Sequence, residues 1–226
     1  MSQNGHKPVR LNIGCGRAQF PAERGAKVVE HIAHYLPETA YDAGAGWVNV
    51  DRISQPGVDF VADSFLYPWP WKDSSVDEIW ASHIVEHIPH DAKLLDGADA
   101  NLLQLLEFAH DGFYAWFYEA WRILKPDGLL HIVCPYAFSV TGVSDPQHTR
   151  YITAQTFSYL QPQRDDAPFQ YRVPFYYEAT GEPIMRTRGD LSDVDERLHQ
   201  YVLYHELNRL DEIYVAVKVV KNADNH

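Results

Sequence analysis

The chain has 226 residues and a formal net charge of −12 at pH 7. The length suffices for one well-buried domain, and the acidic surplus repels phosphate backbones, which argues against a general nucleic-acid binder. Cys15 and Cys134 form no CxxC pair, so we expect two small core residues in a reducing compartment and no cysteine-rich zinc module. The chain carries no apolar signal segment and no run that could span a membrane, so we expect a cytoplasmic protein without membrane association.

Apolar stretches in the first half of the chain predict four strands, at 9–13, 47–51, 58–63 and 76–83, the first of them buried on both faces. Between the first two strands, "KVVEHIAHYL" places apolar residues at helical spacing, and Pro37 closes it. This pattern predicts a helix over 27–36.

Two helices and further strands are expected in the second half. "ANLLQLLEFAH" and "FYAWFYEAWRIL" predict consecutive helices, and "LLHIVCP" predicts a fifth buried strand. Towards the end, "AQTFSYL" has a helical pattern, while "FQYRVPFYYEA" and "DEIYVAVKVVK" are extended. The alternation predicts an α/β, Rossmann-like fold: a mostly parallel sheet with helices on both faces and a C-terminal antiparallel strand.

The predicted organisation is a single domain over 1–226. Residues 9–135 would form a cofactor-binding core, and 136–226 would form the substrate side and the C-terminal strand. The stretch 161–195 is the part of the chain whose pattern is least informative.

Three predicted strands end in residues that suit a ligand. Gly14 and Gly16 end the first strand, Asp51 the second and Asp63 the third. Ligands of open parallel sheets bind outside the carboxyl ends of the strands. Glycine there lets the ligand approach the backbone closely, and an acid can accept hydrogen bonds from both hydroxyls of a ribose. This order predicts a ribose-bearing ligand. Gln19 stands where a dinucleotide fingerprint needs its third glycine, which argues against NAD or FAD.

The chain resembles the class I S-adenosylmethionine-dependent methyltransferases in five segments that occur in order: "LNIGCG", "GWVNVD", "VDFVADSF", "SSVDEIWASHIVEHIPH" and "EAWRILKPDGLLHIVCP". The likeness is greatest to a small bacterial and phage branch related to the type 11 methyltransferase domain. "SDPQHTRYITAQTFSYL" also resembles a segment of that branch. The resemblance covers about residues 9–160 and the terminal strand, and it implies S-adenosylmethionine as the cofactor.

The resemblance implies roles at the ends of the first two strands. Gly14, Cys15 and Gly16 would wrap the methionine part of the cofactor, and Asp51 would hold the ribose hydroxyls. The family usually has an acid where Asn12 stands, and that acid helps to neutralise the cofactor's ammonium group. Asn12 is therefore a departure at an expected cofactor-binding position.

Later segments of the resemblance imply further contacts. Asp63 and the backbone of Ser64 would meet the adenine, and Ser82 and His83 would lie beside the sulfonium and the substrate. The interval from the glycine turn to the second strand is longer than in the family. This insertion within 17–46 would shape a lid or a partner surface.

The stretch "SHIVEHIPH" invites a metal interpretation. His83, Glu86 and His87 could share a helix face, but their order is not H-E-x-x-H and the spacing supplies no third ligand. We therefore predict no metal site, and we expect Glu86 and His87 to be structural.

His148 follows the fifth strand on the expected substrate side, where it could take a proton from an attacking hydroxyl or amine. His83 is the rival candidate, and a loop histidine bonded to backbone is the alternative for His148. Arg150 would either bind an acidic substrate group or pair with a surface carboxylate.

These observations predict an S-adenosylmethionine-dependent methyltransferase whose acceptor is an oxygen or nitrogen atom of a small molecule or a protein. "ASHI" stands where methyltransferases of nucleic-acid bases often carry Asn/Asp-Pro-Pro-aromatic, which argues against a base as acceptor. A non-catalytic protein that binds the cofactor or a partner is the alternative, and a nucleotide-sugar or dinucleotide enzyme is a third hypothesis.

Overall fold

The structure, a computed structural model, describes residues 7–24, 26–30, 32–160, 173, 175–187, 195, 197 and 209–221. Residues 161–172 and 188–194, which include the start of the extended stretch predicted at 169–179, lie outside the described residues. Among the helices that are described, none has both the length and the apolar character of a membrane span.

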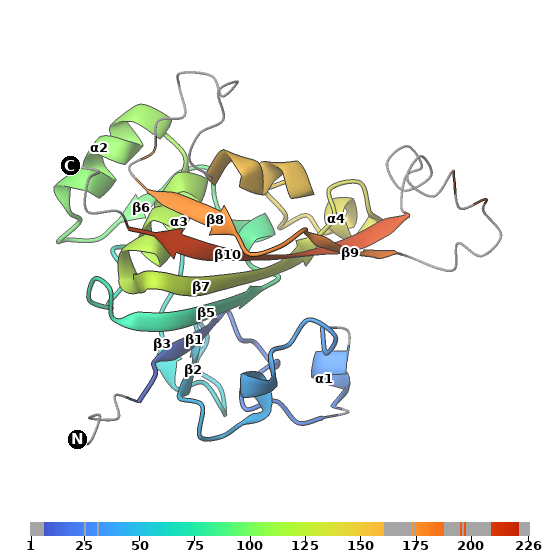
Figure 1. The fold of residues 1–226 in the computed structure, drawn as a ribbon. Helices are drawn as coiled ribbons and strands as arrows, with labels where there is room; N and C mark the ends of the chain where they lie inside the picture. The colour runs from blue at the N-terminus through green and yellow to red at the C-terminus, as the bar shows by residue number, and fades with distance from the viewer. Residues whose placement is uncertain are drawn as a thin grey trace.

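Within the described residues, eight strands form one sheet in the order β3-β2-β1-β5-β7-β10-β8, with β9 also paired to β10 (Figure 1). The strands of this sheet are β1 (Arg10–Ile13), β2 (Trp47–Asp51), β3 (Phe60–Val61), β5 (Val76–Ser82), β7 (Leu124–Pro135), β8 (Tyr176–Ala179), β9 (Ile184–Thr187) and β10 (Leu210–Val220).

The directions of the strands confirm the predicted fold class. The pairs that join β3, β2, β1, β5 and β7 are all parallel, and β10 runs antiparallel to β7, β8 and β9. Most residues of β5 and β7 are buried, as a parallel sheet covered on both faces requires. The third strand is shorter than the predicted 58–63, because only Phe60–Val61 pairs with β2.

Short elements connect these strands: α1 (Lys27–Glu30), η1 (Glu38–Tyr41), β4 (Leu66–Tyr67), η2 (Val85–His87), β6 (Lys93–Leu94), α4 (Val140–Ser144) and η3 (Ala154–Leu160). Strands β4 and β6 pair with each other as a separate two-stranded sheet that the sequence pattern does not indicate.

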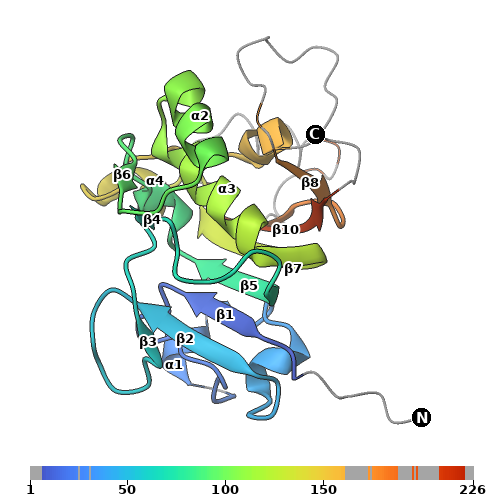
Figure 2. The ribbon, with the colours of Figure 1, turned by 90° about the vertical axis from the view of Figure 1, so that its left-hand side faces the viewer.

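Two longer helices, α2 (Ala100–Ala109) and α3 (Gly112–Ile123), cover one face of the sheet. Asp99 and Asp111 cap them by accepting hydrogen bonds from backbone N–H groups of the first turn. Phe117 and Ala120 of α3 are fully buried in one cluster with Ile79 of β5. Figures 1 and 2 show α2 and α3 together, away from α1, which lies near the β1–β2 end of the sheet.

The segment between β1 and β2 covers the opposite face. Phe20, Ile32 and Tyr35 are buried in one cluster with Trp80. The ring of Tyr35 stacks on Tyr214 of β10 with a centroid distance of 5.2 Å. This part of the predicted insertion is therefore a cover for the sheet.

The helix predicted over 27–36 is wrong in its length. The helix α1 ends at Glu30, and residues 32–35 follow in turns. The apolar residues of this segment are mostly β-branched, with modest helix propensity, and the turns bring Ile32 and Tyr35 onto the sheet. Tertiary packing here outweighs the helical spacing.

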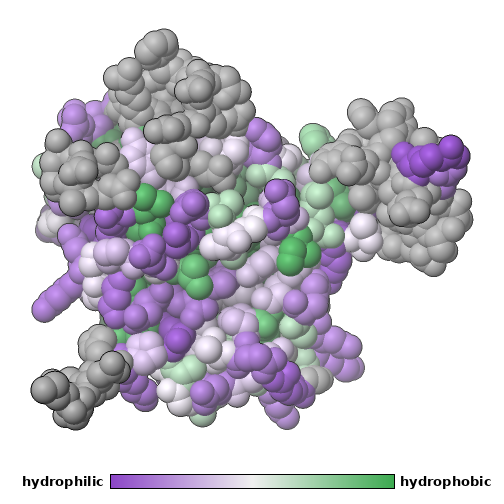
Figure 3. Space-filling view, in the orientation of Figure 1, coloured by the Kyte–Doolittle hydropathy of each residue, from purple (hydrophilic) through white to green (hydrophobic). Residues whose placement is uncertain are grey.

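The surface has the character expected from the charge of the chain. Figure 3 shows hydrophilic residues prevailing on one face, with hydrophobic residues scattered among them. With 22% charged residues and a net charge of −12, such a face is well hydrated.

Candidate functional site

A pocket of about 420 Å³ lies where β1, β2 and β3 end. This volume falls in the range of about 300–1,000 Å³ that is usual for small-molecule sites. The residues that line the pocket are Gly14, Asp51, Arg52, Ala62, Asp63, Ser64, Phe65, Leu66, Ile84, His87, Pro89, Lys93 and Gln147. Gly14, Asp51, Asp63 and Ser64, predicted as cofactor-binding, are thus brought to one pocket.

A glycine turn forms the wall after β1. Gly14 has φ +65°, a left-handed conformation that favours glycine. A Cβ atom on Gly14 would stand 1.9 Å from Cδ1 of Ile84, so the turn and Ile84 are in direct contact. Gly16, two residues on, donates its backbone N–H to Oδ2 of Asp51 at 2.8 Å. The turn after β1 is therefore fastened to the end of β2.

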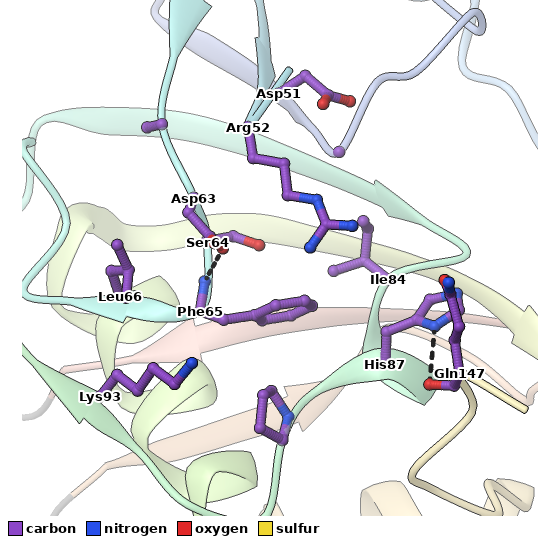
Figure 4. Close-up of a pocket in the computed structure, with 13 residues that line it drawn as sticks. Asp51, Arg52, Asp63, Ser64, Phe65, Leu66, Ile84, His87, Lys93 and Gln147 are labelled. Carbon is purple, nitrogen blue, oxygen red and sulfur yellow. Dashed lines mark hydrogen bonds between the residues drawn. The ribbon is translucent and has the colours of Figure 1, made fainter.

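Asp51 presents a carboxylate to the pocket. Its Oδ1 accepts a hydrogen bond from the backbone N–H of Ile53 at 2.9 Å, while Oδ2 accepts the bond from Gly16. Each carboxylate oxygen has a second lone pair for a ligand donor. In Figure 4 the side chain of Arg52 extends from beside Asp51 towards Phe65 and Ile84, so a fixed acid and a guanidinium border the same space.

The stretch after β3 forms the opposite wall. Asp63 accepts a hydrogen bond from the backbone N–H of Phe65 at 2.9 Å, which fixes a tight turn. The indole of Trp69 donates to the carbonyl of Ser64 at 3.0 Å. Figure 4 shows the Phe65 ring extending into the pocket. This wall offers an acid, backbone groups and a flat apolar ring, which together suit a nucleobase.

Asn12 and Cys15 lie outside the pocket lining. The buried Asn12 amide donates to the carbonyl of Ala18 at 2.8 Å and to Oδ1 of Asn49 at 3.0 Å. Asn49 in turn exchanges hydrogen bonds with the backbone of Phe20. Asn12 therefore holds the loop after the glycine turn. The Cys15 thiol is buried, and burial raises its pKa to about 12, so it is an inert core group as expected.

Ser82 and His83 also lie outside the lining. His83 has φ +56°, uncommon for a residue with a side chain, and its ring lies between two buried acids. Nδ1 is 3.3 Å from Glu86 and Nε2 is 3.2 Å from Glu212. Burial would lower the pKa of His83, but the hydrogen bonds and charges of Glu212 and Glu86 outweigh it and raise the pKa to about 9. A protonated histidine has no lone pair on its ring to accept a proton, so these contacts argue against His83 as a general base.

His148 and His87 meet at the edge of the pocket. Their rings stand edge to face with a centroid distance of 4.8 Å. His87, for which the sequence predicts a structural role, lines the pocket, and its Nδ1 is 3.2 Å from the carbonyl of Gln147 (Figure 4). His148 does not line the pocket, and only 7% of its side chain is exposed. Its Nδ1 is 3.0 Å from the carbonyl of Gly142, which matches the backbone-bonded alternative.

The two residues after His148 fasten its loop to η2. The backbone N–H groups of Thr149 and Arg150 both donate to the carbonyl of Glu86, at 2.8 and 3.1 Å. The Arg150 guanidinium binds both carboxylate oxygens of Asp111, at 2.8 and 2.9 Å. Burial alone would raise the pKa of Asp111, but the Arg150 bond and the backbone N–H of Phe113 lower it overall. Arg150 thus takes the carboxylate-pairing role.

Sequence reasoning missed much of the pocket. Arg52 follows Asp51 in the sequence, and Phe65 follows Ser64. This adjacency to predicted site residues was the available signal. Lys93 lies on β6, whose position depends on its pairing with β4, and Gln147 lies in a loop held by the contacts to η2. No local pattern marks those two residues.

No family model and no curated protein matches this sequence. Among solved structures, the 4+2 cyclase SpnF is 12% identical, with a TM-score of 0.51 over 96% of this chain and 78% of its own. A SAM dependent methyltransferase from Archaeoglobus fulgidus is 18% identical, with a TM-score of 0.48 over 93% of this chain and 86% of its own. A putative type 11 methyltransferase from Sulfolobus solfataricus is 15% identical, with a TM-score of 0.40 over 98% and 89%.

At these identities the likeness is one of fold. The match to SpnF agrees with the Rossmann-like arrangement of the sheet. One of the three proteins is named a cyclase and two are named methyltransferases. A shared fold does not fix a reaction, so the residues of the pocket decide what this chain can bind.

Proposed function

We propose that the chain is an S-adenosylmethionine-dependent methyltransferase acting on an oxygen or nitrogen atom of a small molecule or a protein. The observation that carries the proposal is the convergence of Gly14, Asp51 and Asp63 on one pocket at the carboxyl ends of three adjacent parallel strands. This is where open α/β sheets bind nucleotides. The methyltransferases among the structural neighbours are compatible with it, and assignment to the bacterial and phage branch belongs to the proposal.

The residues present fit S-adenosylmethionine. The pocket volume of about 420 Å³ suits a nucleoside with a short side chain. Asp51 and Asp63 supply acceptors for hydroxyl and amino protons, and Arg52 supplies donors for a carboxylate. The space that a Cβ atom on Gly14 would fill is taken by Ile84, and both residues line the pocket.

The chain's own residues would bind and orient the cofactor. Asp51 would accept hydrogen bonds from the two ribose hydroxyls. The backbone N–H groups of Gly16 and Ile53 hold its carboxylate in place for this contact. Asp63 and the Ser64 backbone would meet the adenine edge, with the Phe65 ring against its face. When bound, S-adenosylmethionine would supply a methyl group whose carbon an acceptor oxygen or nitrogen attacks in line with the C–S bond, so that this bond breaks and S-adenosylhomocysteine leaves. Alignment of the acceptor is then the protein's main contribution.

The acceptor would approach at the rim formed by His87, Lys93 and Gln147. We propose His148 as a residue on the acceptor side, where its ring contacts the ring of His87 edge to face. With Nδ1 donating to Gly142, Nε2 of His148 has the lone pair that a general base needs. The cytoplasmic location predicted from the sequence belongs to the same proposal.

A non-catalytic cofactor-binding protein is the second candidate. Asn12 favours it, because the buried amide is committed to Ala18 and Asn49 and carries no charge for the cofactor's ammonium group. Cofactor affinity would then exist without turnover.

Calorimetry with S-adenosylmethionine, S-adenosylhomocysteine and NAD tests the binding step. We expect binding of the first two and no binding of NAD. Binding of NAD alone at millimolar concentration would contradict the proposal. Incubation with cofactor labelled in the methyl group and a cell extract then tests transfer, since label in an acceptor separates an enzyme from a binding protein.

A further inference from the structure

The geometry points to a binding site for one divalent transition-metal ion, with Zn²⁺ as the best-suited ion, formed by Glu86, His87 and His148 beside the pocket. The sequence spacing argues against a metal, because "HIVEH" fixes no third ligand. The fold supplies that third ligand from the loop after α4, where His148 comes to rest against His87.

The three side chains converge from two separate loops. One ligand atom from each lies within 4.8 Å of the others, and Glu86 is buried while the two histidines are partly so. An ion with bonds of about 2.1 Å holds its ligands closer than this, so the side chains would draw in by roughly an ångström on binding. The carboxylate of Asp145, whose side chain is 45% exposed, stands 3.9 Å from Nε2 of His148.

Both imidazoles are already oriented as ligands. Nδ1 of His87 faces the carbonyl of Gln147, and Nδ1 of His148 faces the carbonyl of Gly142. A carbonyl only accepts, so both Nδ1 atoms carry the proton and the neutral rings leave Nε2 unprotonated. Metal-binding histidines commonly donate their other N–H to a backbone carbonyl in this way, which fixes the tautomer and the ring orientation.

Glu86 provides a second observation that favours a ligand at this place, because one of its two buried carboxylate oxygens has no partner among the described residues. It is 1% exposed, and its Oε2 has no hydrogen-bond donor among the described residues. One oxygen stands 3.3 Å from Nδ1 of His83. A carboxylate removed from water is costly unless it is paired or coordinates a metal, and the second oxygen is available for an ion.

The backbone holds the two halves of the site together. The carbonyl of Glu86 accepts hydrogen bonds from the N–H groups of Thr149 and Arg150, and the Thr149 hydroxyl donates to the carbonyl of Ile88 at 2.7 Å. The residue before this pair is His148. Its position relative to Glu86 and His87 is therefore set by several bonds between the loops.

Two imidazole nitrogens and one carboxylate favour Zn²⁺ or another first-row ion over Mg²⁺, which prefers oxygen ligands. Three protein ligands leave a zinc ion one open position, and His87 borders the pocket. Where the proposed methyltransferase function also holds, that position is open to an oxygen of the acceptor. Nε2 of His148 cannot serve both as metal ligand and as general base, so this inference and the base role exclude each other.

The test is ion binding by the full chain after removal of metals with a chelator, in the absence of S-adenosylmethionine. Calorimetry with Zn²⁺ and Mg²⁺, and the visible absorption of bound Co²⁺, give stoichiometry and ligand type. We expect about one tight Zn²⁺ per chain and no tight Mg²⁺. The matched variants are His87→Asn and His148→Asn, because asparagine can replace the Nδ1–H donor but offers no Nε2 ligand.

We expect each variant to weaken Zn²⁺ binding by about a hundredfold or more. The control is His90→Asn, a neighbouring histidine whose side chain is 68% exposed. Equal Zn²⁺ binding by the wild type and the two variants would show adventitious binding to other histidines and overturn the inference, as would the absence of tight binding. Binding of S-adenosylmethionine is measured separately, so failure of the proposed function leaves this result readable.

Discussion

At the scale of single residues, Asp51 is the side chain on which the proposed cofactor site depends most. Both of its oxygens accept backbone N–H bonds, so the carboxylate is oriented before a ligand arrives. Hydrogen bonds to a charged acceptor contribute about 1.5–3 kcal/mol. Because the Asp51 side chain is already held in place, it loses little conformational entropy when a ligand binds, and the bond can contribute the upper part of this range.

We expect Asp51→Asn to weaken S-adenosylhomocysteine binding by about tenfold to a hundredfold, measured by calorimetry. Asparagine keeps one of the two acceptor oxygens and its size, so the variant should stay folded. Asp42→Asn is the control, since exposed Asp42 accepts a hydrogen bond from the N–H of Gly44 and does not line the pocket. Unchanged affinity in folded Asp51→Asn would make Asp51 a loop-fastening residue only.

The site illustrates what a sequence can predict at this scale. Gly14, Asp51 and Asp63 were predictable because strand ends in a parallel sheet meet at one edge. His87 and Gln147 were not, since their meeting depends on hydrogen bonds between loops far apart in the chain. The charge state of His83 depends on Glu212, which lies on the last strand.

At the scale of elements, a row of polar side chains joins four neighbouring strands on the face opposite α2 and α3. Glu78 of β5 binds Arg10 of β1 at 2.7 Å and lies 3.0 Å from Nε2 of His131 on β7. His131 contacts the hydroxyl of Tyr214 on β10 at 2.8 Å through Nδ1. Burial alone would raise the pKa of Glu78, but its hydrogen bonds to His131 and Arg10 lower it overall.

We expect Glu78→Gln to lower the free energy of unfolding at pH 7 by about 1–3 kcal/mol, because Arg10 and His131 lose their buried acceptor. A lowered folded-state pKa gives stability above the unfolded-state value near 4.5 and loses it as pH falls through the folded-state pKa. Urea unfolding of both proteins should therefore show the difference at pH 7 and a smaller one below pH 4.5. Glu38→Gln, which removes an 85% exposed partner of Arg24, should cost under about 1 kcal/mol at both pH values. A difference for Glu78→Gln that grows towards acid pH would contradict this account.

A second buried pair fastens α3 to the turn before β5. Arg122 binds Glu119 through two hydrogen bonds, at 2.7 and 2.8 Å, and donates to the carbonyls of Trp69 and Trp71. Glu119 is fully buried, whereas Asp73, the other acid bound to Arg122, is 74% exposed. The two acids of one guanidinium therefore lie in very different surroundings.

We expect Arg122→Gln to lower the free energy of unfolding by about 3–5 kcal/mol, because it leaves Glu119 as an unpaired buried charge. Asp73→Asn should cost at most about 1 kcal/mol, since water screens this exposed pair. Urea denaturation of the two variants beside the wild type measures both values. Similar costs for the two substitutions would mean that burial does not set the strength of this cluster.

The elements also show where periodicity is informative. The strands β5 and β7 and the helices α2 and α3 follow from long patterns that agree with their final burial. The segment 27–36 has helical spacing too, yet contacts to Trp80 and Tyr214 decide its path. The β4–β6 pair joins two-residue strands, which are too short to leave a pattern.

At the scale of the whole molecule, the pocket joins the β3–β2–β1 end of the sheet to η2 and to the β4–β6 pair. Its walls come from the ends of β1, β2 and β3, from η2 and β6, and from the loop that carries Gln147. A ligand that binds all of these walls binds the native state and not the unfolded chain. Its binding free energy therefore adds to the stability of the entire fold.

We expect S-adenosylhomocysteine at a hundred times its dissociation constant to stabilise the wild type by about 2.7 kcal/mol. For a chain of this length that corresponds to a rise in Tm of about 5–10 °C in calorimetric scans.

At the same ligand concentration Asp51→Asn, with affinity reduced by about tenfold to a hundredfold, should keep only about 0.4–1.4 kcal/mol of this stabilisation. The exposed control Asp42→Asn should retain all of it. NAD should leave Tm unchanged, because Gln19 replaces the glycine that a pyrophosphate site needs and the pocket volume of about 420 Å³ suits a single nucleoside. A rise in Tm with NAD and none with S-adenosylhomocysteine would assign the pocket to a different ligand class, while equal rises for the wild type and Asp51→Asn would place the ligand away from the end of β2.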